Sequence, residues 1–151
     1  MTTDDAHVYD SPEGWVSEHI QRYVETDGEE GHHWHGVPTL LLTTKGRKSG
    51  KLRRTALIYG TSGSSYVVVA SSGGADNHPA WYLNLAENPE VALQVGAEDL
   101  VAIARTADES EKPELWKMMC QIWPAYEEYQ TKTDRPIPVV VLDPVQPAAD
   151  A

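Results

Sequence analysis

The chain has 151 residues and a mass of 16.7 kDa, which is the size of one domain rather than two. Its 12 Lys and Arg against 23 Asp and Glu give a formal net charge of −11, which does not favour nucleic-acid binding. The longest apolar runs, such as 66–70, are far shorter than the roughly 20 residues of a membrane span, and no basic-then-apolar leader opens the sequence. The single cysteine, Cys120, fits a reducing compartment. We therefore expect a cytoplasmic protein.

The first part of the chain predicts a flexible end followed by one helix. Residues 1–10 are polar and are expected to be flexible. A helix is predicted over 11–26, because Ser11 is a good cap and Pro12 suits the first helical position. One amphipathic face of this helix is marked by residues that recur every four positions, namely Trp15, His19 and Tyr23.

Strand patterns follow from residue 40. Strands are predicted over 40–44, 54–59 and 66–70, the last of them rich in β-branched residues, and short loops should join all three into an antiparallel meander. A long irregular loop is expected over 72–79, followed by a short helix over 80–87 that Asn88-Pro89 ends.

The last third of the chain contains both strand-like and helix-like patterns of apolar residues. A hairpin is predicted from strands 91–95 and 100–105, and a helix from near Ser110 to Ile122 that Pro124 interrupts before a further helical turn. A last strand is expected over 137–142 and a flexible tail over 146–151. Strands dominate, so we predict one domain over 11–145 of the mainly β (α+β) class, an antiparallel β-barrel with two or three covering helices.

The positive charge is concentrated in the turn between the first two predicted strands. No acidic residue occurs between Gly31 and Ala75, whereas six basic residues fall within ten positions, namely Lys45, Arg47, Lys48, Lys51, Arg53 and Arg54. The rest of the chain carries six basic and 23 acidic residues, a net charge of −17. Like charges placed close together repel, so the cluster indicates a site for an anion; a merely solubilising loop is the alternative.

The composition of this turn agrees with an anion site. Gly46, Ser49 and Gly50 leave backbone N–H groups free to approach phosphate oxygens. Three residues separate the glycines and Leu52 follows Lys51, so the turn is not a nucleotide-triphosphate-binding Walker loop.

A second cluster of side chains could suggest a metal. His32, His33 and His35 lie close together, but a zinc site needs four protein ligands, or three and a water molecule. We therefore expect an exposed polar segment and no metal. Cys120 is expected to be an ordinary small buried residue.

Four ordered motifs resemble those of the deazaflavin (coenzyme F420)-dependent nitroreductase and quinone reductase family. They are LLTTKGRKSGK at 41–51 with RRT at 53–55, VASSGG at 69–74 with HPAWY at 78–82, WPAYEEYQTKTDR at 123–135, and NP at 88–89 with IPV at 137–139. The resemblance covers about 40–145, and the first 36 residues carry no part of it.

This resemblance implies a split β-barrel of the flavin-mononucleotide-binding oxidoreductase type and an enzyme that transfers a hydride from reduced F420. The acceptor would be a quinone, a nitro compound or another electron-poor small molecule. F420 carries a phosphodiester and an oligoglutamate tail, which agrees with the cationic turn. The implied coenzyme-binding residues are Lys45, Arg47, Lys48, Ser49, Arg53, Arg54, Thr55, Ala56, Leu57, Ile58, Val69, Ala70, Ser71, Ser72, His78, Ala80, Trp81, Tyr82, Leu83, Asn84 and Tyr126.

The chemistry of hydride transfer belongs to the coenzyme, so no catalytic triad or carboxylate pair is required. The hydroxyls of Ser71, Tyr126 and Tyr129 could stabilise the negative charge that forms on the acceptor, or pass on a proton. Flavin mononucleotide in the same barrel is the first alternative, and a non-enzymatic module that binds polyanions is the second. We expect a monomer or homodimer. Membrane contact by the first helix is not favoured, because it contains Glu13, Glu18 and Glu25.

Overall fold

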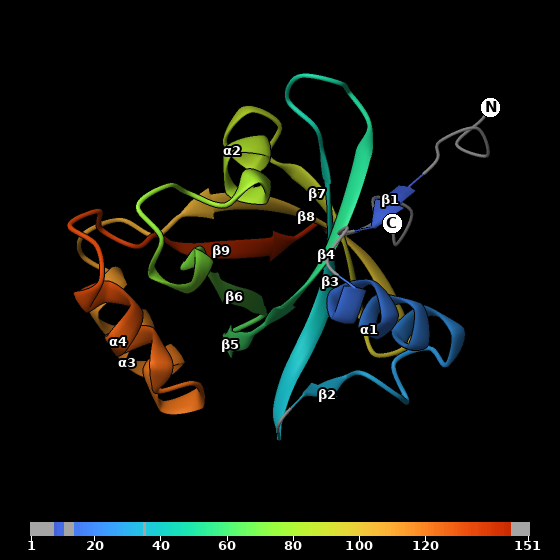
Figure 1. Cartoon of the computed structure of the whole chain (residues 1–151), viewed down its shortest axis with the longest axis horizontal. Coiled ribbons are helices and arrows are strands. Elements are labelled where there is room, and N and C mark those ends of the chain that lie inside the picture. The colour runs from blue at the N-terminus through green and yellow to red at the C-terminus, as the bar shows by residue number, and fades with distance from the viewer. Residues whose placement is uncertain (1–7, 11–13, 35, 146–151) are drawn as a thin grey trace.

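The computed structural model describes residues 8–10, 14–34 and 36–145, and its elements follow one another from blue to red in Figure 1. The helices are α1 (Gly14–Glu25), α2 (Ala80–Glu87), α3 (Lys112–Ile122) and α4 (Ala125–Thr131), with a short 3-10 turn at Ser72–Gly74. The strands are β1 (Val8–Asp10), β2 (His33–Trp34), β3 (Val37–Lys45), β4 (Leu52–Ile58), β5 (Gly60–Ser62), β6 (Ser65–Val69), β7 (Glu90–Val95), β8 (Glu98–Thr106) and β9 (Val139–Pro144).

Most predicted elements are confirmed. The helix at Ala80–Glu87 has the predicted bounds, and the hairpin of β7 and β8 forms where alternation of apolar residues indicated it. The predicted interruption at Pro124 separates α3 from α4. Residues 8–10, expected within a flexible end, form a strand parallel to β4, while the predicted start of α1 at 11–13 and the tail at 146–151 lie outside the described residues.

The predicted three-strand meander is wrong in its last step. β3 and β4 pair antiparallel as expected, but β6 pairs with β5 on one side and with β9 on the other. The order of strands in the sheet is β1-β4-β3-β7-β8-β9-β6-β5. A single residue, Tyr59, joins β4, which lies next to β1 at one end of this order, to β5 at the other end. The sheet therefore curls into a barrel (Figure 1).

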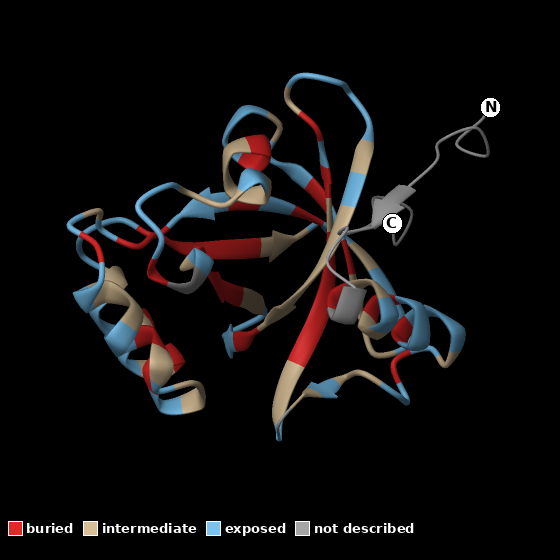
Figure 2. Ribbon diagram, viewed as in Figure 1, coloured by how far each residue is buried: buried red, intermediate tan, exposed pale blue. Residues whose placement is uncertain are grey.

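Three apolar clusters hold the barrel and its helices together. The first fills the barrel and includes Leu40, Leu42, Val68 and Leu142. Alternation along each strand turns the other set of side chains outward, where helices bury them. The second cluster packs α3 and α4 on the outer faces of β6 and β9, and the third packs α1 on β3 and β4. Figure 2 shows these buried residues in red, with the two helical groups on separate sides of β4.

The α1 helix is fixed by a hydrogen-bonded side chain as well as by packing. Tyr23 is fully buried, and its hydroxyl donates to the carbonyl of Thr39 in β3 at 3.0 Å. The same hydroxyl accepts from the backbone N–H of Gly96, between β7 and β8, at 2.6 Å. This one phenol therefore joins α1 to two parts of the barrel, and it holds one wall of the cleft described next.

Candidate functional site

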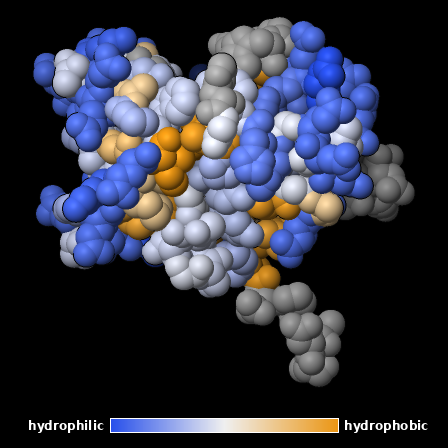
Figure 3. Space-filling model, turned by 90° about the horizontal axis from the view of Figure 1, so that it is seen from below, coloured by the Kyte–Doolittle hydropathy of each residue, from blue (hydrophilic) through white to orange (hydrophobic). Residues whose placement is uncertain are grey.

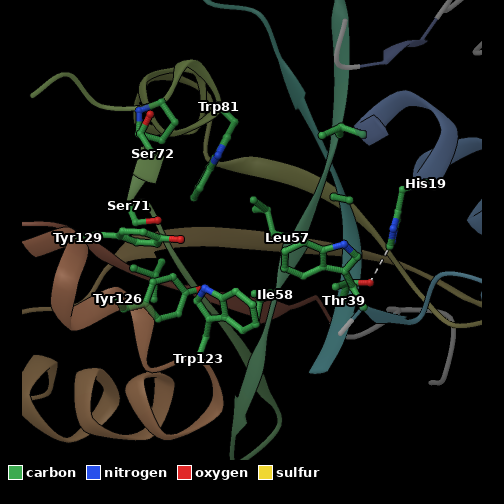
Figure 4. Close-up of a pocket in the computed structure, with 15 residues that line it drawn as sticks. His19, Thr39, Leu57, Ile58, Ser71, Ser72, Trp81, Trp123, Tyr126 and Tyr129 are labelled. Carbon is green, nitrogen blue, oxygen red and sulfur yellow. Dashed lines mark hydrogen bonds between the residues drawn. The ribbon is translucent and has the colours of Figure 1, made fainter. Parts of the chain in front are cut away.

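A cleft of about 360 Å³ lies on the outside of the barrel, between α1 and α4. This volume is in the range of small-molecule sites. Its floor comes from β4 and the end of β6, and its walls come from α1, β2, the start of α2 and the segment before and within α4 (Figure 4). The residues that line it are Val16, His19, Trp34, Thr39, Ala56, Leu57, Ile58, Val69, Ser71, Ser72, Pro79, Trp81, Trp123, Tyr126 and Tyr129.

Aromatic rings make the walls of the cleft flat and apolar. Trp34 and Trp123 lie with their ring centroids 5.2 Å apart, and Tyr126 and Tyr129 meet edge to face at 6.1 Å. In the view of Figure 3, apolar side chains gather in the middle of the face, between hydrophilic surfaces on either side. Such walls suit a planar ring system, whose binding would be stabilised by stacking on these rings and by removal of its apolar surface from water.

Tyr126 is the most buried of the polar residues predicted to be catalytic. Only 5% of it is exposed, and burial raises the pKa of its phenol well above the ordinary value. Tyr126 is therefore neutral at physiological pH. It can donate a hydrogen bond, but it is a weak acid for full proton transfer.

The loop that carries Ser71 and Ser72 is held in a strained and close-fitting conformation. Ser72 has φ +47°, a left-handed conformation that is rare for residues other than glycine. Gly74 has φ +85°, and a Cβ atom at this position would lie 2.7 Å from the carbonyl oxygen of Tyr129. The glycine therefore lets this loop lie directly against α4, so that Ser71, Ser72 and Tyr129 border the same part of the cleft.

The α1 side of the cleft presents a histidine whose tautomer is fixed by its partner. His19 Nε2 lies 3.3 Å from Thr39 Oγ1, and that hydroxyl donates at 2.5 Å to the carbonyl of Gly31. A carbonyl can only accept, so Thr39 has already used its proton and must accept from His19. The neutral ring consequently carries its proton on Nε2.

The basic turn between β3 and β4 lies beside α2 rather than inside the cleft (Figure 1). Arg47 is tied to α2, because its Nη1 and its backbone N–H donate to Asn84 Oδ1 at 3.0 and 3.2 Å. Lys48 and Ser49 are exposed. Alternation along β4 places Arg54 on the same face as Ala56 and Ile58, so cationic and cleft-lining side chains follow one another along this strand.

Nine of the residues implied as coenzyme-binding or catalytic line the cleft, namely Ala56, Leu57, Ile58, Val69, Ser71, Ser72, Trp81, Tyr126 and Tyr129. A separate hollow is lined by His78, Tyr82 and Leu83. The remaining ones border neither of these two cavities and lie along β4, at the end of β6, in α2 and in the basic turn; they are Lys45, Arg47, Lys48, Ser49, Arg53, Arg54, Thr55, Ala70, Ala80 and Asn84.

Sequence reasoning did not place six lining residues in the site, namely Val16, His19, Trp34, Thr39, Pro79 and Trp123. Two of them carried a usable signal. His19 stands on the amphipathic face predicted for the first helix, and Trp123 opens the third motif.

His32, His33 and Cys120 make contacts within the fold, while His35 lies outside the described residues. His32 Nε2 lies 2.8 Å from the Tyr59 hydroxyl, and its ring meets that of His33 edge to face. Over residues 8–10, 14–34 and 36–145, no group of three or more His, Cys, Asp or Glu is arranged to hold a metal ion. Cys120 is buried, as predicted.

A deazaflavin with an anionic tail fits what these residues offer. The apolar aromatic walls match a planar ring, and the basic turn on the same strand matches the phosphodiester and glutamate groups. A family model described as F420H(2)-dependent quinone reductase matches residues 15–144. The chain belongs to this family.

Membership of the F420H(2)-dependent quinone reductase family confirms the predicted activity, hydride transfer from reduced F420 to a quinone, and it does not favour the flavin-mononucleotide alternative. The match begins inside α1. The expectation that the first 36 residues share nothing with the family is therefore wrong, which agrees with the place of α1 in the cleft wall.

Relatives of this reductase are found in Mycobacterium tuberculosis. An F420H(2)-dependent quinone reductase of that organism is 39% identical over 128 residues, which are 82% of this chain and 86% of the relative. A putative F420H(2)-dependent quinone reductase of the same organism is 38% identical over 108 residues, 72% of this chain and 91% of the relative.

Two solved structures share the fold of this reductase. One, named F420-H2 dependent reductase (FDR-A), is 43% identical with a TM-score of 0.66, covering 70% of this chain and 94% of that one. The other, described as a domain-swapped dimer, is 41% identical with a TM-score of 0.68, covering 88% of this chain and all of that one. The predicted split-barrel fold class is confirmed.

None of the helices in the described ranges is both long enough and apolar enough to span a bilayer.

Proposed function

We propose that the cleft between α1 and α4 holds the ring of reduced F420 and that the anionic tail follows β4 to the basic turn. The observation that carries this proposal is the order of side chains on one face of β4. Ile58 and Ala56 form the cleft floor, Arg54 follows on the same face, and the cationic turn comes next. A ligand with an apolar ring at one end and negative charges at the other would satisfy both ends of this strand.

The Ser71–Ser72 end of the cleft would receive the polar edge of the ring, with Trp81 and Tyr129 on either side. The part walled by His19, Trp34 and Thr39 would then be open to the quinone. This arrangement would hold donor and acceptor in contact and keep water from the reacting atoms.

When bound, reduced F420 supplies a hydride. An acceptor oxygen gains negative charge as the hydride arrives, and hydroxyl donors nearby lower the energy of that charge. Because burial keeps the pKa of Tyr126 high, this residue would donate a hydrogen bond to the oxygen without losing its proton. Tyr129 and Ser71, which border the polar edge of the ring, would donate to the ring and orient it, so these three residues act in our proposal by orientation and charge stabilisation.

A binding titration tests the location of the site. Anaerobic addition of reduced F420, followed by the fluorescence of the tryptophans that line the cleft, is expected to show saturable binding below about 100 μM, which requires only about 5.5 kcal/mol. Ser71→Leu would fill the cleft and raise the Kd at least about tenfold, which is 1.4 kcal/mol. Ser64→Leu is the matched control, because Ser64 is exposed at the turn between β5 and β6. Equal affinities of the two variants would place the coenzyme elsewhere.

The expected partner is a small electron-poor molecule, with a quinone as the class that the family indicates. One relative of known structure is a domain-swapped dimer, which supports the homodimer among the two oligomeric states expected. Reduction of nitro compounds, a cytoplasmic location and the absence of membrane contact stay predictions.

A further inference from the structure

Arg135 contacts the site loop from outside the cleft. Its guanidinium donates to three carbonyl oxygens of one loop: Nη1 to Ala70 at 3.2 Å, Nη2 to Ser71 at 2.9 Å and Nε to Ala75 at 3.0 Å. Nη1 also lies 2.9 Å from His78 Nδ1. Burial and the neighbouring guanidinium lower the pKa of His78, so its neutral ring can accept this fourth hydrogen bond at physiological pH.

The loop separates Arg135 from the cleft. Arg135 and His78 line the hollow on one side of the loop, Ser71 and Ser72 line the cleft on the other, and the two cavities share no lining residue. The guanidinium therefore acts on the cleft through the backbone and not by touching its contents.

Peptide geometry gives the direction of that action. All peptide bonds in the described ranges are trans, and in a trans unit the N–H points opposite to the C=O. The carbonyls of Ala70 and Ser71 point to Arg135, so the N–H groups of the next residues, Ser71 and Ser72, point away from it. Within the described residues neither N–H has a hydrogen-bond partner, and both belong to residues that line the cleft.

We propose that Arg135 is a positioning residue that turns two backbone N–H groups, those of Ser71 and Ser72, into the cleft as hydrogen-bond donors. This inference rests on the proposed function, because the acceptor would be an oxygen at the polar edge of the bound ring. The charge of Arg135 also polarises both peptide units, which strengthens their N–H groups as donors. An arginine is required, since only its planar fork reaches several carbonyls at fixed angles, and a lysine presents one point charge.

Substitution tests the role of the fork. Arg135→Ala is expected to raise the Kd of reduced F420 by about 10- to 100-fold, the value of hydrogen bonds to a charged group. Arg135→Lys should not restore affinity, whereas added methylguanidinium should restore part of it in Arg135→Ala, because the hollow is open to solvent. An unchanged Kd in Arg135→Ala would overturn the proposal.

Two control variants separate orientation of the peptides from general anchoring. Asp76→Ala removes another tie to the same loop, the 2.8 Å hydrogen bond from Thr133 Oγ1 to Asp76 Oδ1, and leaves in place the 3.2 Å hydrogen bond from the Arg135 backbone N–H to Thr133 Oγ1. Arg105→Ala removes an arginine that pairs with Asp143 at 2.9 Å, away from the loop. Both should retain the wild-type Kd within about threefold; an effect of Asp76→Ala as large as that of Arg135→Ala would reduce Arg135 to a general anchor.

A measurement on the unmodified chain decides the matter if Arg135→Ala does not fold. In ¹H–¹⁵N spectra, saturation with F420 should move the amide protons of Ser71 and Ser72 downfield as they form hydrogen bonds. Saturable binding that leaves both amides unmoved would refute the positioning role and leave the proposed function standing. Absence of saturable binding to the wild type would refute the proposed function itself.

Discussion

Gly74→Ala is the perturbation that most directly tests how the site loop and α4 are held together. The alanine would have to adopt φ +85°, which costs about 1–2 kcal/mol for an L-residue. Its Cβ would also lie 2.7 Å from the carbonyl oxygen and 3.0 Å from the Cα of Tyr129, so backbone atoms must move. Such overpacking typically costs a further 1–3 kcal/mol or so. We expect the free energy of unfolding to fall by about 2–5 kcal/mol in total.

Gly63→Ala isolates the steric part of this cost. Gly63 has φ +61°, but a Cβ atom there would meet nothing within 4 Å, so only the conformational cost remains. Urea unfolding of both variants should show Gly74→Ala less stable by at least about 1 kcal/mol, which corresponds to roughly 2–4 °C in Tm for a chain of this size. The displaced Tyr129 should also weaken coenzyme binding in Gly74→Ala alone. Equal losses of stability would refute the close approach of the loop to α4.

Three further substitutions test other parts of the molecule. Above pH 10 the free energy of unfolding of the wild type should fall by up to about 1.4 kcal/mol per pH unit relative to that of Tyr126→Phe, because the phenol ionises at its ordinary pKa in the unfolded chain while burial keeps it protonated in the folded one. Denaturant unfolding of both proteins from pH 8 to 12 measures this difference. Parallel curves of unfolding free energy against pH would contradict it. Lys48→Ala should raise the Kd for F420 by about 2- to 5-fold at low salt, but should leave unchanged the Kd for the tail-free deazaflavin and the Kd for F420 at 1 M salt. Lys117→Ala on α3 should change neither titration. A loss of affinity that persists with the tail-free ring would show that Lys48 does not act on the tail. Tyr23→Phe should lower the free energy of chemical unfolding by about 1–3 kcal/mol, since a buried backbone N–H and a buried carbonyl lose their hydrogen-bond partner. Tyr82→Phe removes an exposed hydrogen bond of the hydroxyl and should lower it by less than about 0.5 kcal/mol. Similar losses in the two variants would show that burial of the hydrogen bond does not matter.

Elements with a strong local period could be predicted from the sequence, and pairings between distant strands could not. α2 has its predicted bounds because Pro79 and Asn88-Pro89 confine it, and the alternation of Val91, Leu93 and Val95 identifies β7. The position of β6 depends on Tyr59, where one run of β residues leaves the pairing with β3 and begins another with β6. No local pattern marks that change of partner.

The same division holds for the site. Ala56–Ile58 and Ser71–Ser72 could be predicted because they lie in motifs whose spacing resembles that of the family. His19 and Thr39 lie in the cleft because α1 packs on β3, a tertiary contact without a sequence signature. Arg135 is the last residue of the third motif, yet its role could not be predicted, because its partners include three backbone carbonyls that any residue type could supply.

The separation of charge along the chain has a consequence for how a ligand arrives. A net charge of −17 outside residues 31–75 surrounds a cationic turn of six basic residues. An incoming polyanion is repelled over most of the surface and attracted at one place, so long-range forces orient it tail first before any contact forms. Collisions in the wrong orientation are thereby reduced, and the planar end of the molecule is delivered beside the opening that it has to enter.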